Sequence, residues 1–120
     1  MTPESPLRVV FYRTDSGNEP VREWLKALPQ EERKIIGEDI KTVQFCWPLG
    51  MPLVKKMAPH LWEVRSRLRN RIARILFTVH GSTIIVLLHG FMKKTQRTPD
   101  EDLDLARRRM RDVSEVPHEE

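Results

Sequence analysis

Three runs of apolar, β-branched and aromatic residues dominate the second half of the chain. They span residues 61–68, 71–79 and 83–92, and the first two alternate apolar with polar positions. Alternation with a period of two is typical of strands that bury one face. Arg69-Asn70 and Gly81-Ser82 lie between the runs and are short turn candidates. The pattern therefore predicts a three-stranded antiparallel meander.

The residues before the meander predict one strand and two helices. Residues 7–12 alternate well enough for a short strand. Pro20 suits the first turn of a helix, and Pro29 separates that helix from a second one. The apolar residues of these helices recur at helical spacing: Val21, Trp24, Leu25, Leu28, Ile36, Ile40 and Val43. The two segments predict a helical hairpin, followed by a proline-rich loop over residues 47–52.

The end of the chain predicts a third helix. Thr98 is expected to cap it, with Pro99 at the first helical position and Glu101 completing a capping box. Residues 115–120 are expected to be a frayed acidic tail. The expected order is β-α-α-β-β-β-α. This predicts one α+β domain over residues 1–120, with a small, mostly antiparallel sheet, an N-terminal helical hairpin and a C-terminal helix.

Composition excludes several classes of protein. No run approaches 18 apolar residues, so no membrane span is expected. The N-terminus lacks a secretion signal, and the single cysteine, Cys46, excludes an internal disulfide framework. One cysteine and four scattered histidines offer no convincing metal site. We therefore expect a cytoplasmic protein that needs neither a metal nor another cofactor.

Positive charge is concentrated in one part of the chain. Residues 55–97 contain ten Lys or Arg and a single acid, Glu63, whereas the flanking segments are close to neutral or acidic. A localised positive surface most often serves nucleic acid. The alternative is an ordinary solvated face, although such a face would normally mix the two signs.

Strand register decides which of these charges meet. If both turns contain two residues, Arg65 lies opposite Arg74, and Arg74 lies opposite His89, with Arg67 and Lys93 nearby. The other face would then be a core under the helical hairpin, made by Trp62, Val64, Ala73, Ile75, Phe77, Val79, Ile84, Val86 and Leu88. Leu61, Leu76, Ile85 and Leu87 would lie further along the charged face, under the C-terminal helix.

The predicted row of cations suits cleavage of an RNA backbone. Two opposed arginines repel each other unless an anion lies between them, and the guanidinium group matches the oxygens of a phosphate. A histidine beside them could carry a proton at neutral pH. Cleavage requires deprotonation of a 2′-OH, stabilisation of charge on the phosphoryl oxygens and protonation of the leaving oxygen.

Several motifs resemble the RelE/HigB superfamily of toxin–antitoxin mRNA interferases, in particular its phage-derived HigB-like branch. They are Pro20-Val21-Arg22-Glu23-Trp24-Leu25, Leu61-Trp62-Glu63-Val64-Arg65, residues 71–77, and the long segment from Leu87 to Pro99, LLHGFMKKTQRTP, with Ala106 downstream. Together they cover roughly residues 8–110. The resemblance implies a RelE-like fold and a toxin that cuts mRNA, usually on the ribosome, without a metal. It also implies a cognate antitoxin, typically a helix-turn-helix DNA-binding protein.

The resemblance and the expected register together give the candidate site residues. Arg65, Arg74 and Lys93 are candidate catalytic residues, with His89 as a possible acid or base. A second set is expected to bind RNA: Arg67, Lys94, Lys55, Lys56 and Arg97.

Each candidate also has a structural interpretation. Arg65 and Arg74 could form salt bridges with Glu63 or with the acidic C-terminal helix. His89 could be hydrogen-bonded packing at a strand end, and Lys55 and Lys56 could belong to a solvated loop. A non-catalytic module that uses the same basic face to bind RNA or protein is therefore the alternative to an endoribonuclease.

Overall fold

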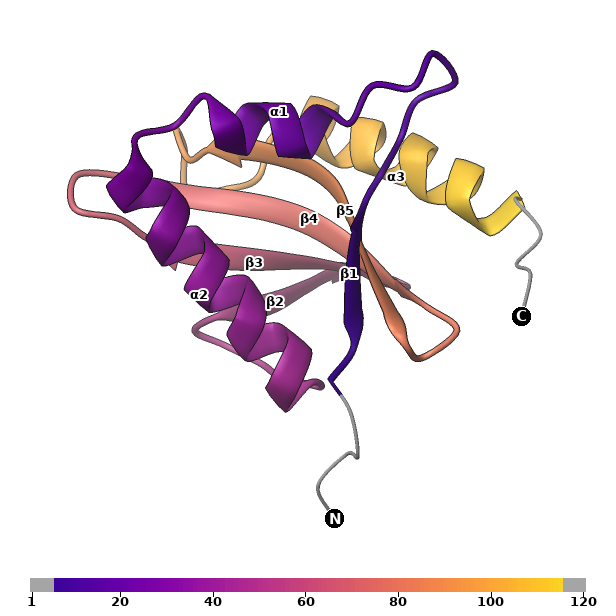
Figure 1. Ribbon diagram of the computed structural model, residues 1–120, viewed down its shortest axis with the longest axis horizontal. Helices are drawn as coiled ribbons and strands as arrows, with labels where there is room; N and C mark the ends of the chain where they lie inside the picture. Colours follow the sequence, from indigo (N-terminus) through magenta and orange to yellow (C-terminus); the bar gives the residue numbers. More distant parts are fainter. Residues whose placement is uncertain (1–5, 116–120) are drawn as a thin grey trace.

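The computed structural model describes residues 6–115, with side chains to residue 113. Within this range the chain forms one five-stranded sheet and three helices (Figure 1). Along the chain these are β1 (Arg8–Phe11), α1 (Pro20–Lys26), α2 (Gln30–Cys46), β2 (Val54–Ala58), β3 (Leu61–Arg67), β4 (Ile72–His80), β5 (Ile84–Met92) and α3 (Asp100–Glu115). The strand order is β1-β5-β4-β3-β2, and only the β1–β5 pair is parallel among them. The α+β class and the mostly antiparallel sheet are confirmed.

The helices cover the two faces of the sheet unequally. α1 and α2 lie across one face, and α3 lies across part of the other (Figure 1). The larger core, under α1 and α2, includes Val21, Ile36, Val43, Val54, Val64, Ala73, Ile75, Phe77, Ile85 and Leu87. The smaller core, under α3, is made by Leu61, Leu76, Val86, Leu88 and Ala106. The charged residues Glu63 and Arg74 of β3 and β4 lie beside the segment that leads into α3, where they bond Thr98.

The three tryptophans, Trp24, Trp47 and Trp62, pack against the larger core. Trp47 meets Trp62 edge to face, with ring centroids 4.9 Å apart. Phe77 stacks on Trp62 at 6.1 Å. Trp24 packs so closely on β5 that a Cβ atom at Gly90 would lie 2.6 Å from its ring. Glycine at position 90 therefore lets α1 approach the sheet.

The strand β2 is a correction to the expected order. Lys55 and Lys56 were expected beside a flexible loop, but Val54–Ala58 pairs antiparallel with β3. Val54 lies opposite Val64 and is buried, whereas both lysines are exposed. A five-residue segment with two adjacent lysines lacks clear alternation. The edge strand is stabilised by pairing with β3 and by one buried valine.

The first predicted hairpin has the expected register. Arg65 lies opposite Arg74, Arg67 opposite Ile72, and Trp62 opposite Phe77. The alternating pattern therefore fixed both the pairing and the faces of β3 and β4.

The second predicted register is wrong, for two separate reasons. The turn contains three residues, because His80 pairs with Ile84. A β-bulge between Leu76 and Phe77 then shifts the pairing by one further residue. As a result, Phe91 lies opposite Arg74, and His89 lies opposite Leu76.

The two irregularities also exchange residues between the cores. Ile85 and Leu87 face α1 and α2, whereas Ile84, Val86 and Leu88 face α3, the reverse of the prediction. One residue of shift turns every side chain to the other face, and the second shift restores the expected face beyond the bulge. The carbonyl oxygen of Leu88, at this irregularity, accepts a hydrogen bond of 2.7 Å from Arg109 Nη1. Burial at this contact lowers the pKa of Arg109.

The start of α3 also differs from the prediction. Thr98 lies two residues before the helix, and its hydroxyl group bonds Arg74 and Glu63, so it does not act as the expected cap. Leu103, Ala106, Met110 and Val113 form the buried side of α3 and pack in the smaller core. Glu115 ends α3, and residues 116–120 of the expected frayed tail lie outside the described residues.

Candidate nucleic-acid interface

A buried ionic cluster joins β3, β4 and the segment before α3. The side chains of Glu63 and Arg74 are 0% and 3% exposed. Glu63 accepts hydrogen bonds from Arg65 Nε at 3.0 Å and from the Thr98 hydroxyl group at 2.7 Å. Arg74 donates from Nη1 to Thr98 Oγ1 at 3.0 Å and from Nη2 to the Gln96 carbonyl at 3.2 Å. We call Glu63, Arg74 and Thr98 the buried cluster.

The two opposed arginines therefore have different environments. Arg74 Nε lies 3.7 Å from Glu63 Oε1 and makes no hydrogen bond to the described residues. The side chain of Arg65 is 20% exposed. Within the described residues, its guanidinium group bonds Glu63, and it does so through Nε. The terminal nitrogens of Arg65 remain available for another anion. The salt bridge to Glu63, one of the structural interpretations of the sequence, is present for both arginines.

A groove of ≈ 440 Å³ adjoins the buried cluster. Its lining comes from α2, the loop before β2, strands β3 and β4, and the residue after β5: Ile35, Asp39, Met51, Pro52, Leu53, Arg65, Arg67, Ile72, Arg74 and Lys93. Neither Arg67 nor Lys93 forms an ion pair within residues 6–113, and Arg65 shares Glu63 with Arg74. The groove therefore offers two unpaired cations and one partly paired cation. Phosphate is a suitable anion for this arrangement.

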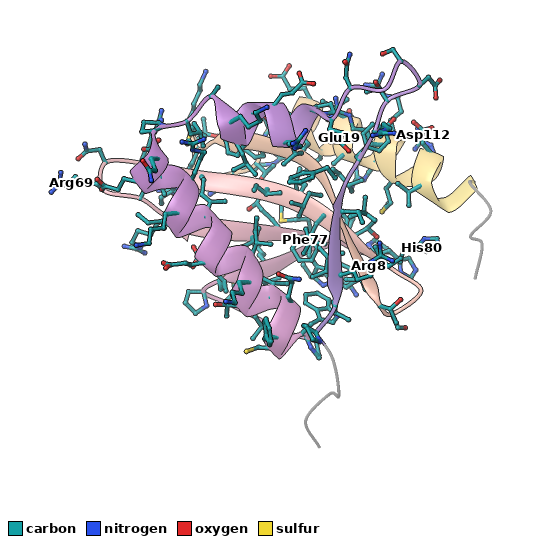
Figure 2. All side chains as sticks on the ribbon, viewed as in Figure 1. Arg8, Glu19, Arg69, Phe77, His80 and Asp112 are labelled. Atoms are coloured by element: carbon teal, nitrogen blue, oxygen red, sulfur yellow. The ribbon has the colours of Figure 1, made fainter. Side chains whose placement is uncertain are left out.

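Two neighbouring hollows hold the other predicted RNA-binding residues. One is lined by Lys55, Lys56 and Arg97 and shares Arg65 with the groove. The other is lined by Arg67, Arg69, Lys93 and Lys94, at the turn between β3 and β4. Figure 2 shows Arg69 at the outer end of this turn and His80 at the opposite end of β4. The structure thus brings the predicted cations together around three adjoining hollows, because the groove shares Arg65 with the first hollow and Arg67 and Lys93 with the second.

His89 lies apart from these hollows. Its Nε2 atom is 2.6 Å from Asp102 Oδ1 in the first turn of α3, and its ring stacks on Phe91 with centroids 5.5 Å apart. The predicted row Arg65–Arg74–His89 is therefore wrong, because Phe91 occupies the place opposite Arg74. A carboxylate at this distance orients the imidazole ring, as carboxylates do for histidines that transfer protons.

Tyr12 is the other side chain near this face that could exchange a proton. It follows β1 directly, and its hydroxyl group donates a hydrogen bond of 2.7 Å to Asp112 Oδ2 on α3. Burial, followed by the hydrogen bond to Asp112, raises the pKa of Tyr12. The guanidinium group of Arg109 also covers its ring at 5.3 Å. These contacts attach α3 to the residue that follows β1, and Tyr12 does not line the groove.

Three features of the site were not predicted from the sequence: the burial of Glu63, the role of Thr98 and the position of Asp39. Glu63 was visible as the one acid of the basic segment, but its complete burial was not. Thr98 looked like a helix cap because its neighbours form a capping pattern. Asp39 was an ordinary polar position on α2, although it lines the groove. Each depends on contacts between segments that are distant along the chain.

Comparison with known proteins identifies the family. Residues 23–111 match the model of the family described as "Phage derived protein Gp49-like (DUF891)". The chain therefore belongs to the phage-derived Gp49-like family, a family of RelE/HigB-like toxins. Among curated proteins, none shows a significant match.

Two further observations concern metals and membranes. In residues 6–115, no three His, Cys, Asp or Glu side chains gather as a metal-ligand set. None of the helices in the part of the chain that the structure describes is long and apolar enough to cross a membrane.

Proposed function

We propose that this chain is the toxin of a toxin–antitoxin module: an endoribonuclease that cuts mRNA on the ribosome without a metal and so inhibits translation. The groove with its incompletely paired cations, in a chain of the Gp49-like family, carries the proposal. The substrate is mRNA in the cytoplasm, and the cognate antitoxin is a helix-turn-helix DNA-binding protein, as the resemblance implies.

The groove supports a specific division of roles. Arg65, Arg67 and Lys93 contact the phosphate and stabilise the charge that develops on its oxygens. Arg74 is too deeply buried to share this contact fully, so it acts by holding Glu63, which in turn fixes Arg65 Nε. The exposed cations Lys55, Lys56, Lys94 and Arg97 bind the flanking RNA backbone. Their contribution is electrostatic and independent of sequence.

The covalent step needs no redox partner. The 2′-oxygen loses its proton and attacks the adjacent phosphorus, while the bond from phosphorus to the 5′-oxygen breaks. The 5′-oxygen takes up a proton, leaving a 2′,3′-cyclic phosphate and a 5′-hydroxyl end. His89, oriented by Asp102, is our candidate for one of the proton transfers.

Inducible expression in a bacterium without the antitoxin tests this function. We would compare growth and mapped mRNA 5′ ends for the wild type, Arg65→Ala and the control Arg8→Ala. Arg8 is an exposed arginine on β1, at the sheet edge opposite β2. Arrest with new cuts that vanish in Arg65→Ala and persist in Arg8→Ala is the expected result. A folded wild-type chain that causes neither arrest nor cuts would contradict the proposal.

A non-catalytic binding module remains the second candidate. The observation that favours it is the pairing of Arg65 and Arg74 with Glu63 and of His89 with Asp102, since paired groups can be purely structural. The variant His89→Ala separates the two functions. An endoribonuclease should lose cleavage and keep its affinity for RNA, whereas for a binding module, which cuts nothing, affinity is the only property that substitutions can change.

A further inference from the structure

The groove has two chemically different walls. The cationic wall comes from β3, β4 and the segment after β5, and it holds Arg65, Arg67, Arg74 and Lys93 together with Ile72. The opposite wall comes from α2 and the loop before β2, and it is apolar apart from one carboxylate: Ile35, Asp39, Met51, Pro52 and Leu53. Met51 is 60% exposed, which is unusual for a large apolar side chain. A cationic wall facing an apolar wall fits a ligand with an anionic end and a flat apolar end.

Asp39 is the one acidic residue in the lining of this groove, and it has no ion-pair partner among the described residues. Its carboxylate forms no ion pair or hydrogen bond with the residues that the structure describes, although Arg65, Arg67 and Lys93 line the same groove. Glu63, by contrast, binds both of its neighbouring arginines. A carboxylate held apart from nearby cations is available to accept hydrogen bonds from a ligand. Ionised carboxylates accept and never donate.

The donor pattern of a nucleobase decides which base such a carboxylate prefers. Single-stranded RNA is read through the base-pairing edges of unstacked bases. Guanine presents two adjacent donors on this edge, N1–H and the N2 amine, which match the two carboxylate oxygens. On the other bases the donor lies beside an acceptor that would repel a carboxylate. The bidentate pair is therefore specific to guanine.

We infer that Asp39 reads a guanine in single-stranded RNA whose phosphate is held by Arg65, Arg67 and Lys93. This inference rests on the proposed function and names the base that the groove selects. The base lies against Met51 and Pro52, since apolar side chains support flipped or unstacked bases as aromatic ones do. The volume of ≈ 440 Å³ is within the range of about 300–1,000 Å³ typical of small-ligand sites.

Binding of short RNAs to the purified full chain tests the inference directly. The probes are labelled pentanucleotides UUXUU with guanine, inosine, adenine or cytosine at X, followed by fluorescence anisotropy. We expect guanine to bind about tenfold more tightly than adenine, as one bidentate contact provides. Inosine keeps N1–H but lacks the N2 amine, so it should bind with intermediate affinity.

Two variants of α2 provide the comparison. Asp39→Asn keeps the size of the side chain but replaces one acceptor by a donor, so it should abolish the preference for guanine. Glu38→Gln, a matched exposed control one residue away, should retain it. The same variants in the bacterial experiment should show guanine enriched at a fixed position relative to the cuts, except in Asp39→Asn.

The outcomes separate this inference from the proposed function. RNA binding or cutting that depends on Arg65 but shows no preference for guanine would overturn the role of Asp39 and leave the nuclease proposal intact. A guanine preference that survives in Asp39→Asn would also overturn the role of Asp39 and leave the nuclease proposal intact. Absence of both cuts and Arg65-dependent binding would overturn the proposed function, and the inference with it.

Discussion

The buried cluster and the groove beside it use the same residue types for opposite purposes. In the buried cluster, Arg74 is 3% exposed, forms an ion pair with Glu63 and donates a hydrogen bond to Thr98. Thr98 in turn donates a hydrogen bond to Glu63. In the groove, Arg67 and Lys93 line an open surface and form no ion pair within the described residues. Arg65 lies between the two regions and contributes to both.

The difference shows how this fold keeps cations close together. Arginines on adjacent strands repel each other, and one buried carboxylate between them compensates that repulsion. Thr98 satisfies the remaining oxygen of Glu63. The neutralised arginine is thus buried beneath the surface, and the incompletely neutralised cations line the groove. If this view is correct, substitutions in the two regions must have different consequences.

The largest expected effect is on stability, in the buried cluster. Arg74→Ala leaves Glu63 buried with one partner fewer and should reduce the free energy of unfolding by about 3–5 kcal/mol. Arg65→Ala removes one charged hydrogen bond at a partly exposed position, so its loss should be about 1–2 kcal/mol. Urea denaturation measures both. Equal losses in the two variants would abolish the distinction between the cluster and the groove.

The opposite face of β5 provides the second test, because β5 leads directly to Lys93. Gly90→Ala places a Cβ atom 2.6 Å from the Trp24 ring, and this overpacking should cost about 1–3 kcal/mol. Combining it with Trp24→Leu should cost less than the sum of the two single changes, since the smaller side chain relieves the contact. Thermal denaturation of the four proteins measures this coupling. Strict additivity would mean that the contact does not limit position 90.

In the groove, the expected effect is on RNA affinity. Lys93→Ala should leave stability within about 0.5 kcal/mol of the wild type. It should weaken binding of all the pentanucleotides similarly and reduce the slope of log affinity against log salt by about 1. Lys26→Ala, at an exposed position at the end of α1, is the control and should change neither. An unchanged salt slope in Lys93→Ala would remove Lys93 from the phosphate contact.

The smallest expected effect concerns the attachment of α2, which carries Asp39. Arg71 binds Glu32 through two hydrogen bonds, of 3.0 and 2.6 Å. These hydrogen bonds are the main reason why the pKa of Glu32 is lowered. A carboxyl group whose pKa is lowered by folding contributes stability above its ordinary pKa, and this contribution is lost as the pH falls through the folded value. Wild type and Glu32→Gln should therefore differ slightly in stability at neutral pH and converge in acid. A difference that persists in acid would exclude this pair as its source.

Much of the fold was predictable from local patterns. The alternation in residues 61–79 fixed β3, β4 and the pairing of Arg65 with Arg74, because any slip would have moved apolar residues to the other face. The helical spacing of Val21, Ile36 and Val43 placed α1 and α2 on the larger core. β5 was harder, since residues 84–88 are apolar throughout and are compatible with either face.

The sequence by itself determined the α+β class, the order of all elements except β2, and the concentration of positive charge in residues 55–97. Only the tertiary structure decided that the turn after His80 has three residues and that a bulge follows, so that Phe91 rather than His89 lies beside Arg74. It also decided which cations are neutralised, because the burial of Glu63 depends on α3 and on Thr98, 35 residues further along the chain. Periodicity acts between near neighbours and can be read from the chain, whereas the burial of a charge depends on which distant segments exclude water from it.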